Sequence, residues 1–300
     1  MTATMTTQAR PGFVKAWMLA ARPATLSAAA VPVLVGTGAA IHAGDFNPFV
    51  LLAALLAALL IQIGTNFAND VFDFERGADT DERLGPPRVT QSGLLSPRDV
   101  RLGMVAMFGA AALLGLYLAW IGGWPIIAIG TASIIAGVAY TGGPWPFGYH
   151  GLGDVFVFCF FGLIAVCGTY YLHTGEVSGL SVAAASGVGF LITAILVVNN
   201  LRDRATDART GKRTLAVRLG DRATRWQFAV LLGGAYAVVV AMAFASSLWL
   251  LLPLLSLPLA VRVAAPVMRG SEGRALNLTL KGTARLTLVY GLLLAVAFLP

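Results

Sequence analysis

The chain has 300 residues, of which 57% are hydrophobic and only 12% are charged, and its mean hydropathy is +0.78. Soluble domains carry about 25% charged residues, so this composition excludes an ordinary soluble protein and indicates an integral membrane protein. The net charge of +7 would suit nucleic acid or anionic lipid. No basic module stands apart from the apolar segments, which argues against a nucleic-acid partner and leaves the lipid bilayer.

The apolar segments predict an all-α, polytopic fold. A membrane helix needs about 20 apolar residues, and on that measure we expect about nine spans. They lie near 24–42, 49–72, 101–121, 124–141, 153–172, 179–200, 226–245, 247–268 and 280–299. We expect a single membrane domain, 1–300, whose first 22 residues are a polar tail without the features of a cleaved signal peptide.

Basic residues fall on alternate connections. All 21 lysines and arginines lie in the tail, or in or near the connections after the second, sixth and eighth spans. Basic connections mark the cytoplasmic side of a membrane protein. The sequence therefore predicts a multi-pass protein of the cell (inner) membrane with a cytoplasmic N-terminus.

Two polar segments close the second and sixth spans. Residues 66–93 read NFANDVFDFERGADTDERLGPPRVTQSG, and residues 199–214 read NNLRDRATDARTGKRT. Acidic residues at a membrane edge are costly and tend to be functional, so their repetition favours a site over two ordinary loops. The sixth span follows the second by four spans, an even step that gives both helices one direction, as in a duplicated four-helix unit.

The two segments share the pattern Asn-x-x-x-Asp. It occurs at Asn69 and Asp73, and again at Asn199 and Asp203, with Asp207 one turn further on. Residues four apart share one face of a helix. Mg²⁺ favours carboxylate, carbonyl and phosphate oxygens, so two such faces across a cavity predict a magnesium site.

Further polar residues surround the first pattern. Asn66, Asn69 or Asp70, and Asp73 form one stripe of a helix. Gly77 and the Gly-Pro-Pro run at 85–87 break that helix. Asp79 is then expected on a loop that folds back over the site.

Cations adjoin both segments and suit an anionic substrate. Arg88, Lys212 and Arg213 would neutralise a diphosphate that Mg²⁺ bridges. The chain has no phosphate-binding loop of the soluble nucleotide enzymes, so a diphosphate carried on a lipid fits best.

Two further stretches of the sequence each allow two interpretations. Arg22, before Pro23, is either a cytoplasmic anchor at a helix start or a substrate contact. The run YTGGPWPFGYHGLG, from Tyr140, is either the lining of a pocket for a flat ring or an interfacial aromatic belt.

These motifs together resemble the UbiA-type intramembrane prenyltransferases. The resemblance rests on NDxxD from Asn69, on DxxxD from Asp203, and on ARPATL from Ala21. GPPRVTQSG at 85–93 and YTGGP at 140–144 resemble the branch that prenylates 1,4-dihydroxy-2-naphthoate in menaquinone biosynthesis. In the wider superfamily a third acid follows the second by four residues, whereas this chain has Gly77 at that place and its next acid is Asp79.

The resemblance implies a helical bundle around a central cavity that opens to the cytoplasm. Mg²⁺ and a polyprenyl diphosphate would bind at its mouth beside an aromatic acceptor, which loses CO₂ as it is prenylated. The implied metal ligands are Asn69, Asp73, Asp203 and Asp207. The expected catalytic residues are Asp73, Asp203 and Lys212. Expected substrate contacts are Arg22, Asn66, Asp70, Asp79, Arg88, Gln91, Tyr140, Asn199, Asn200 and Arg213.

Two other functions remain open at this stage. The same fold would serve a different acceptor, such as 4-hydroxybenzoate, homogentisate or a lipid. A transporter would hold ions at polar residues near the bilayer midplane, and the clustering of acids at span ends on one side disfavours it.

Overall fold

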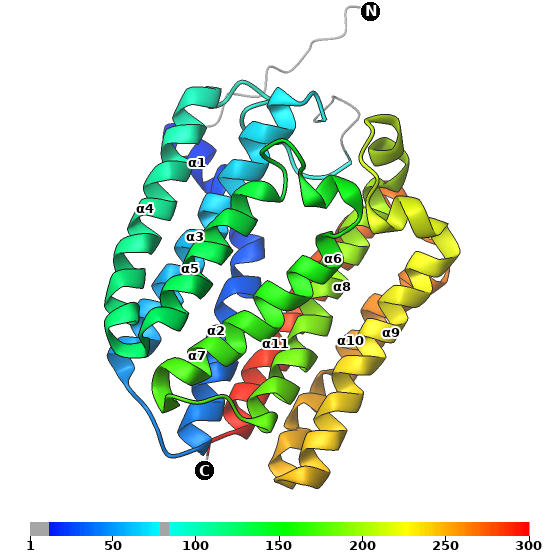
Figure 1. Ribbon diagram of the computed structural model, residues 1–300. Helices are drawn as coiled ribbons and strands as arrows, with labels where there is room; N and C mark the ends of the chain where they lie inside the picture. The colour runs from blue at the N-terminus through cyan, green and yellow to red at the C-terminus, as the bar shows by residue number, and fades with distance from the viewer. Residues whose placement is uncertain (1–11, 79–83, 300) are drawn as a thin grey trace, which may run out of the picture.

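A computed structural model describes residues 12–78 and 84–299, and all regular structure in these ranges is helical (Figure 1). This confirms the all-α prediction. The α-helices are α1 (Phe13–Ala21), α2 (Leu26–His42), α3 (Pro48–Glu75), α4 (Pro97–Gly122), α5 (Trp124–Ala139), α6 (Gly153–Val157), α7 (Ala165–Thr174), α8 (Gly179–Arg209), α9 (Leu215–Ala245), α10 (Leu257–Met268) and α11 (Leu276–Ala297). The shorter helical segments are η1 (Pro23–Thr25), η2 (Phe147–His150), η3 (Phe158–Ile164), η4 (Leu248–Ser256) and η5 (Gly273–Ala275).

Eight helical stretches of the described chain are long and apolar enough to cross a membrane. The fourth predicted span, 124–141, corresponds to α5, which has 16 residues and extends over about 24 Å. That length is short of the roughly 30 Å of a bilayer core. The count of nine therefore stays a prediction, whereas the integral membrane character is plain.

Local chemistry fixes where the helices begin. Asn47 caps α3 by accepting hydrogen bonds from the backbone N–H groups of Phe49 and Val50. Ser178 and Ser181 form a reciprocal capping box at the start of α8. Both helices then run uninterrupted for 28 and 31 residues, which carries their polar ends to the same end of the bundle.

Helix α2 lies inside the bundle and packs through glycines. A Cβ added to Gly36 would lie 2.5 Å from the carbonyl oxygen of Val166 on α7, and one added to Gly38 would lie 2.7 Å from that of Ala295 on α11. The absent side chains let the backbones approach closely, as is typical of helix interfaces in membranes. The largest buried cluster joins α2, α7, α8, α9 and α11.

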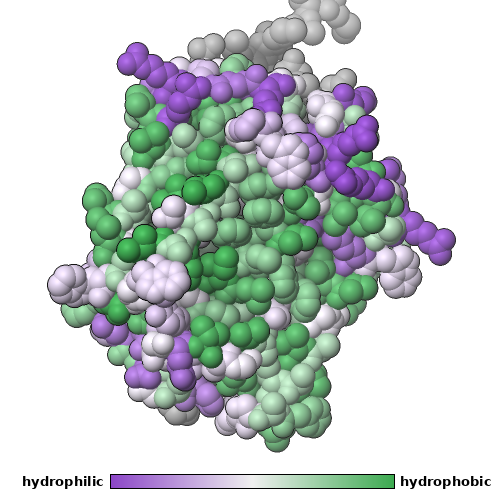
Figure 2. Space-filling view, viewed as in Figure 1, coloured by the Kyte–Doolittle hydropathy of each residue, from purple (hydrophilic) through white to green (hydrophobic). Residues whose placement is uncertain are grey.

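Polar residues gather at one end of the molecule. In Figure 1 the connections after α3, α5 and α8 all lie at the upper end, and the end of α11 lies at the opposite end. Figure 2 shows hydrophilic side chains concentrated around that upper end above a broad hydrophobic band. The arrangement brings both sequence motifs to one polar edge of an apolar bundle.

Candidate active site

Asp73, in the last turn of α3, is the centre of the polar end. It is 2% exposed, and three donors from three different segments reach its carboxylate. Arg88 Nη2 lies 2.9 Å from Oδ2, and the Tyr149 hydroxyl and Lys212 Nζ lie 2.7 and 3.1 Å from Oδ1. Lys212 also stands 4.6 Å from the centroid of the Tyr149 ring. The structure thus joins the two predicted segments at one buried carboxylate.

Asp70 and Asn66 hold the surrounding fold in place. The Asp70 carboxylate accepts hydrogen bonds from the backbone N–H groups of Val89 and Thr90 and lies 3.9 Å from the guanidinium of Arg22. The Asn66 amide donates to the carbonyl of Ala21 and to the hydroxyl of Thr25. Two residues of the predicted stripe therefore have structural contacts. Asp70 holds the loop that carries Arg88, and Asn66 holds the segment that leads into α2.

Arg22 connects α1 to η1 in a conformation that side chains rarely adopt. Its φ of 50° makes it the one non-glycine residue with positive φ among those described. Such a backbone costs free energy, and Pro23 fixes the turn that follows. Arg22 stands at a helix start, as its first interpretation expects, and its side chain points to Asp70.

Asn69 faces the end of α5. Its side-chain oxygen accepts a hydrogen bond of 2.9 Å from the hydroxyl of Thr141. Arg76 donates from Nε to the carbonyl of Thr141 and from Nη2 to the carbonyl of Gly143. The glycine-rich stretch after α5 is thereby fastened to α3.

The second motif is organised by Arg202, a residue that the sequence marked only as a topological signal. Its buried guanidinium lies 2.5–2.7 Å from the carboxylate of Asp203 and 2.9 Å from the side-chain oxygens of Asn199 and Asn277. Asn277 in turn donates to the carbonyl of Leu84. Asn200 is buried and Asp207 is half-buried on the same helix. Arg202 therefore orients the second acidic face and ties it to the loop after α3.

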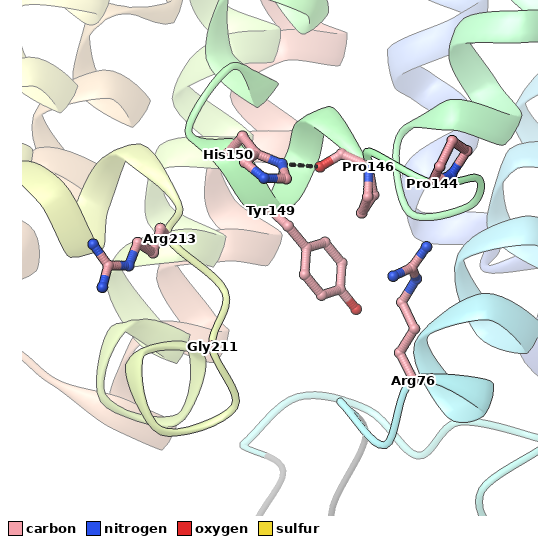
Figure 3. Close-up of a pocket in the computed structure, with 7 residues that line it drawn as sticks. All are labelled: Arg76, Pro144, Pro146, Tyr149, His150, Gly211 and Arg213. Atoms are coloured by element: carbon pink, nitrogen blue, oxygen red, sulfur yellow. Dashed lines mark hydrogen bonds between the residues drawn. The ribbon is translucent and has the colours of Figure 1, made fainter.

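A cavity of 330 Å³ opens beside Asp73 (Figure 3). Its lining consists of Arg76, Pro144, Pro146, Tyr149, His150, Gly211 and Arg213. Figure 3 shows the side chains of Arg76 and Tyr149 turned toward one another and that of Arg213 turned away. His150 is tied to the carbonyl of Pro146 at 2.9 Å, as expected of a loop histidine.

Tyr140 stands near the carboxylates of both motifs. Burial raises the pKa of its phenol well above the ordinary value, and the charges of Asp154, Asp73 and Asp207 raise it further. The ring of Tyr140 meets that of Phe147 edge to face at 5.4 Å. Tyr140 is therefore a neutral hydroxyl at the site, suited to donate a hydrogen bond.

Two further predicted substrate contacts belong to the segment after α3. Gln91 lies in the described loop beside Arg88, and Asp79 lies outside the described residues. The sequence analysis did not single out Tyr149, Arg76 or Arg202 as site residues. The available signals were the aromatic run after Tyr140 and the basic residues beside each motif. Hydrogen bonds between residues more than 60 positions apart, such as Tyr149 to Asp73, leave no periodic signal.

The donor set fits Mg²⁺ when the substrate supplies part of the shell. Within 12–78 and 84–299 no three acidic, histidine or cysteine side chains cluster as an all-protein metal cage. Mg²⁺ usually binds one or two carboxylates together with substrate phosphates and water. Asp73 and Asp203 supply hard oxygen atoms, and Arg88, Lys212 and Arg202 supply the positive charge that balances them in this structure.

Comparison with known proteins gives the family. The model of the UbiA prenyltransferase family matches residues 29–299. The chain is 42% identical to 1,4-dihydroxy-2-naphthoate octaprenyltransferase of Mycobacterium tuberculosis over 93% of this chain and 95% of that protein. It is 37% identical to the Escherichia coli protein of the same name, over 93% of each chain.

Solved structures share the fold at low sequence identity. A UbiA homolog from Aeropyrum pernix K1 superposes with a TM-score of 0.68 at 14% identity and covers 90% of this chain and 96% of its own. A UbiA homolog from Archaeoglobus fulgidus, bound to GPP and Mg²⁺, gives a TM-score of 0.66 at 14% identity, over 95% and 99%. With the sequence relatives, these findings confirm the resemblance, and the chain belongs to the UbiA prenyltransferase family.

Proposed function

We propose that this protein transfers a polyprenyl group from polyprenyl diphosphate to 1,4-dihydroxy-2-naphthoate and releases diphosphate and CO₂ to give demethylmenaquinol. The observation that carries the proposal is the meeting of Arg88 and Lys212 at Asp73, which places two cations and a carboxylate at the edge of an apolar bundle. The acceptor is proposed from the relatives, five of which share the name 1,4-dihydroxy-2-naphthoate octaprenyltransferase at 32–42% identity.

The residues of the polar end would act on the leaving group. Bound Mg²⁺ would supply Lewis-acid stabilisation of the diphosphate, with Asn69, Asp73, Asp203 and Asp207 as its proposed protein ligands. Arg88 and Lys212 then turn from Asp73 to the diphosphate oxygens and balance the charge that develops as the allylic C1–O bond breaks. Tyr149, which contacts both Asp73 and Lys212, holds the lysine in position for this exchange.

The acceptor needs no strong protein base. The ring carbon that bears the carboxylate attacks C1 of the prenyl chain as the diphosphate departs with the electron pair of the C1–O bond. The bond between the ring and the carboxylate then breaks, CO₂ leaves, and its electron pair restores the aromatic ring. The apolar bundle excludes water, which protects the allylic cation from hydrolysis.

Product analysis tests the proposal directly. Purified protein with Mg²⁺, a long-chain prenyl diphosphate and carboxyl-labelled 1,4-dihydroxy-2-naphthoate should release one labelled CO₂ for each demethylmenaquinol formed. Removal of the metal with EDTA should stop turnover, and added Mg²⁺ should restore it. Prenylation of 4-hydroxybenzoate with its carboxylate retained, and no reaction with the naphthoate, would overturn the assignment of the acceptor.

A further inference from the structure

Asp154 is a buried acid that the mechanism described above does not use. It lies in the first turn of α6 and is 6% exposed. Its side-chain partner is Gln227 of α9, whose Nε2 donates a hydrogen bond of 3.0 Å to Oδ1. The other carboxyl oxygen, Oδ2, is buried without a hydrogen-bond partner among the described residues, and so is Oε1 of Gln227. Both atoms are acceptors when the acid is ionised, so the pair lacks a donor.

The charge of Asp154 is not balanced by a cation. At the site, Asp73 meets both Arg88 and Lys212. No basic side chain in the described ranges forms an ion pair with Asp154. An isolated buried carboxylate costs so much free energy that the group takes up a proton instead. Burial without a cation therefore favours the neutral acid.

The segments around Asp154 offer no other balancing charge. Their titratable or charged groups are Tyr140, His150, Cys159, Arg218, Arg222 and Arg225. His150 and Arg218 are bound to backbone carbonyls, Arg222 is exposed, and Arg225 is held by Asp221. Residues 179–198 of α8, which packs against α6, include no acidic, basic, histidine, cysteine or tyrosine side chain. A proton on the acid itself is thus the simplest way to neutralise it.

Asp154 also stands beside residues that shape the site. A Cβ on its neighbour Gly153 would lie 2.9 Å from the hydroxyl oxygen of Tyr140, so α6 begins in close contact with that side chain. Tyr149, a hydrogen-bond donor in the site, precedes Asp154 by five residues. The bond between Asp154 and Gln227 therefore fastens to α9 the end of the aromatic run that bears these tyrosines.

We propose that Asp154 is a positioning residue that works as a neutral carboxylic acid, with a proton on Oδ2 that is donated to Oε1 of Gln227. Together with the bond from Nε2 to Oδ1, this second hydrogen bond closes a ring between carboxyl and amide and satisfies both remaining atoms. The closed pair holds the start of α6, and with it Tyr140 and Tyr149, in place. The effect on the reaction rests on the proposed prenyl transfer.

A neutral Asp154 suits the charge of the proposed substrates. Diphosphate and the naphthoate carboxylate are both anionic, and an unbalanced carboxylate near Tyr140 would repel them. The phenol of Tyr140 keeps its proton in either state of Asp154, because burial is the largest cause of its raised pKa. Loss of the Asp154 proton at high pH would therefore open the ring and add a repelling charge.

The test replaces the acid by an amide. Asp154→Asn keeps both hydrogen bonds, because the new amide N–H takes the place of the acid proton. Full-length protein in nanodiscs is assayed with Mg²⁺, a polyprenyl diphosphate and 1,4-dihydroxy-2-naphthoate. The variant should match the kcat/KM of the wild type at about pH 6. Once the wild type begins to lose its proton, the ratio of variant to wild type should rise by up to about tenfold per pH unit, because one group titrates.

Two further variants bracket this result. Asp154→Leu cannot form the ring, so it should lower kcat/KM by at least about tenfold at every pH, as expected when site residues are misplaced. Glu176→Gln is the matched control, since Glu176 is an exposed acid beyond the far end of α7. Its pH profile should follow that of the wild type.

Infrared spectroscopy detects the proton without turnover. At about pH 6 the wild type should show the carbonyl stretch of a protonated carboxylic acid that is missing in Asp154→Asn. Should that variant lose its thermal transition, Gln227→Leu takes its place in this measurement. It removes the amide partner, so the same stretch should move.

Each outcome decides between a proton and a charge. A large loss of activity in Asp154→Asn at about pH 6, or a wild type without the carboxylic acid stretch, would overturn the proposal and indicate an ionised Asp154 that a water molecule bridges to Gln227. Absence of prenyl transfer in the wild type would instead overturn the proposed function, and the infrared measurement would still decide whether Asp154 holds a proton.

Discussion

Asp73 and Asp203 are acidic residues that each meet a buried guanidinium, one from Arg88 and one from Arg202. We expect Asp73→Asn and Asp203→Asn each to lower kcat by at least about a hundredfold, the scale for removing a group that stabilises charge on a leaving group. The measurement is turnover of the purified protein at saturating Mg²⁺ and donor, with thermal melting as a check of folding.

Glu75 supplies the control for these variants. It lies half a turn beyond Asp73 on the same helix, and its partner is the exposed Arg101. Surface ion pairs contribute about 0–1 kcal/mol, so Glu75→Gln should keep both rate and stability. Equal losses in Glu75→Gln and Asp73→Asn would contradict a special role for the buried carboxylate.

Tyr140 provides a prediction about pH. Because burial and three nearby carboxylates raise the pKa of its phenol above the ordinary value of about 10, the hydroxyl stays protonated between about pH 6 and pH 10. Tyr140→Phe should therefore lower kcat/KM by a constant factor across this range. A titration near neutral pH that disappears in the phenylalanine variant would show that Tyr140 acts as a base.

Residue types were easier to predict than residue partners. The spacing of Asn69 and Asp73, and of Asn199 and Asp203, follows from helical geometry and could be read directly. The contacts of Asn66 and Asp70 could not, because they depend on Ala21 and on the loop at 88–90, which approach α3 only in the folded chain.

At the scale of the helix, the glycines of α2 give a stability prediction. Gly36→Ala would force a methyl group to 2.5 Å from the backbone oxygen of Val166, and backbone atoms cannot rotate away. Overpacking of this kind costs about 1–3 kcal/mol, so the melting temperature in detergent should fall. Gly109→Ala, which enters open space, should leave it unchanged; a similar fall in both variants would indicate a general effect of losing glycine.

Span positions followed from hydropathy, whereas departures from regular α-helix did not. The fifth predicted span, 153–172, contains the π-helical segment η3, where Gly162 packs against Gly189 of α8. The eighth, 247–268, begins as a 3₁₀ segment around Pro253, a residue that cannot donate to a helical ladder. Hydropathy averages over 20 residues and does not register such local contacts.

For the molecule as a whole, the distribution of basic residues predicts orientation. In a background without Cys159 and Cys167, a single cysteine at Ala208 should resist an impermeant thiol reagent in intact cells, and one at Glu176 should react. Ala208 lies in the exposed last turn of α8, and Glu176 lies exposed at the other end of that helix. Reaction at Ala208 from outside would reverse the proposed orientation.

The joining of Asp73 to Lys212 has a consequence for how the protein is made. Arg88 follows Asp73 by 15 residues, but Lys212 follows it by 139. At about 5–20 residues per second, a ribosome adds the arginine within roughly 1–3 s and the lysine only after roughly 7–28 s. Arg88 is therefore available to pair with the Asp73 carboxylate before Lys212 has been made. Because the proposed site also needs Lys212 and Asp203, we expect prenyl transfer only from a chain whose second half has been synthesised.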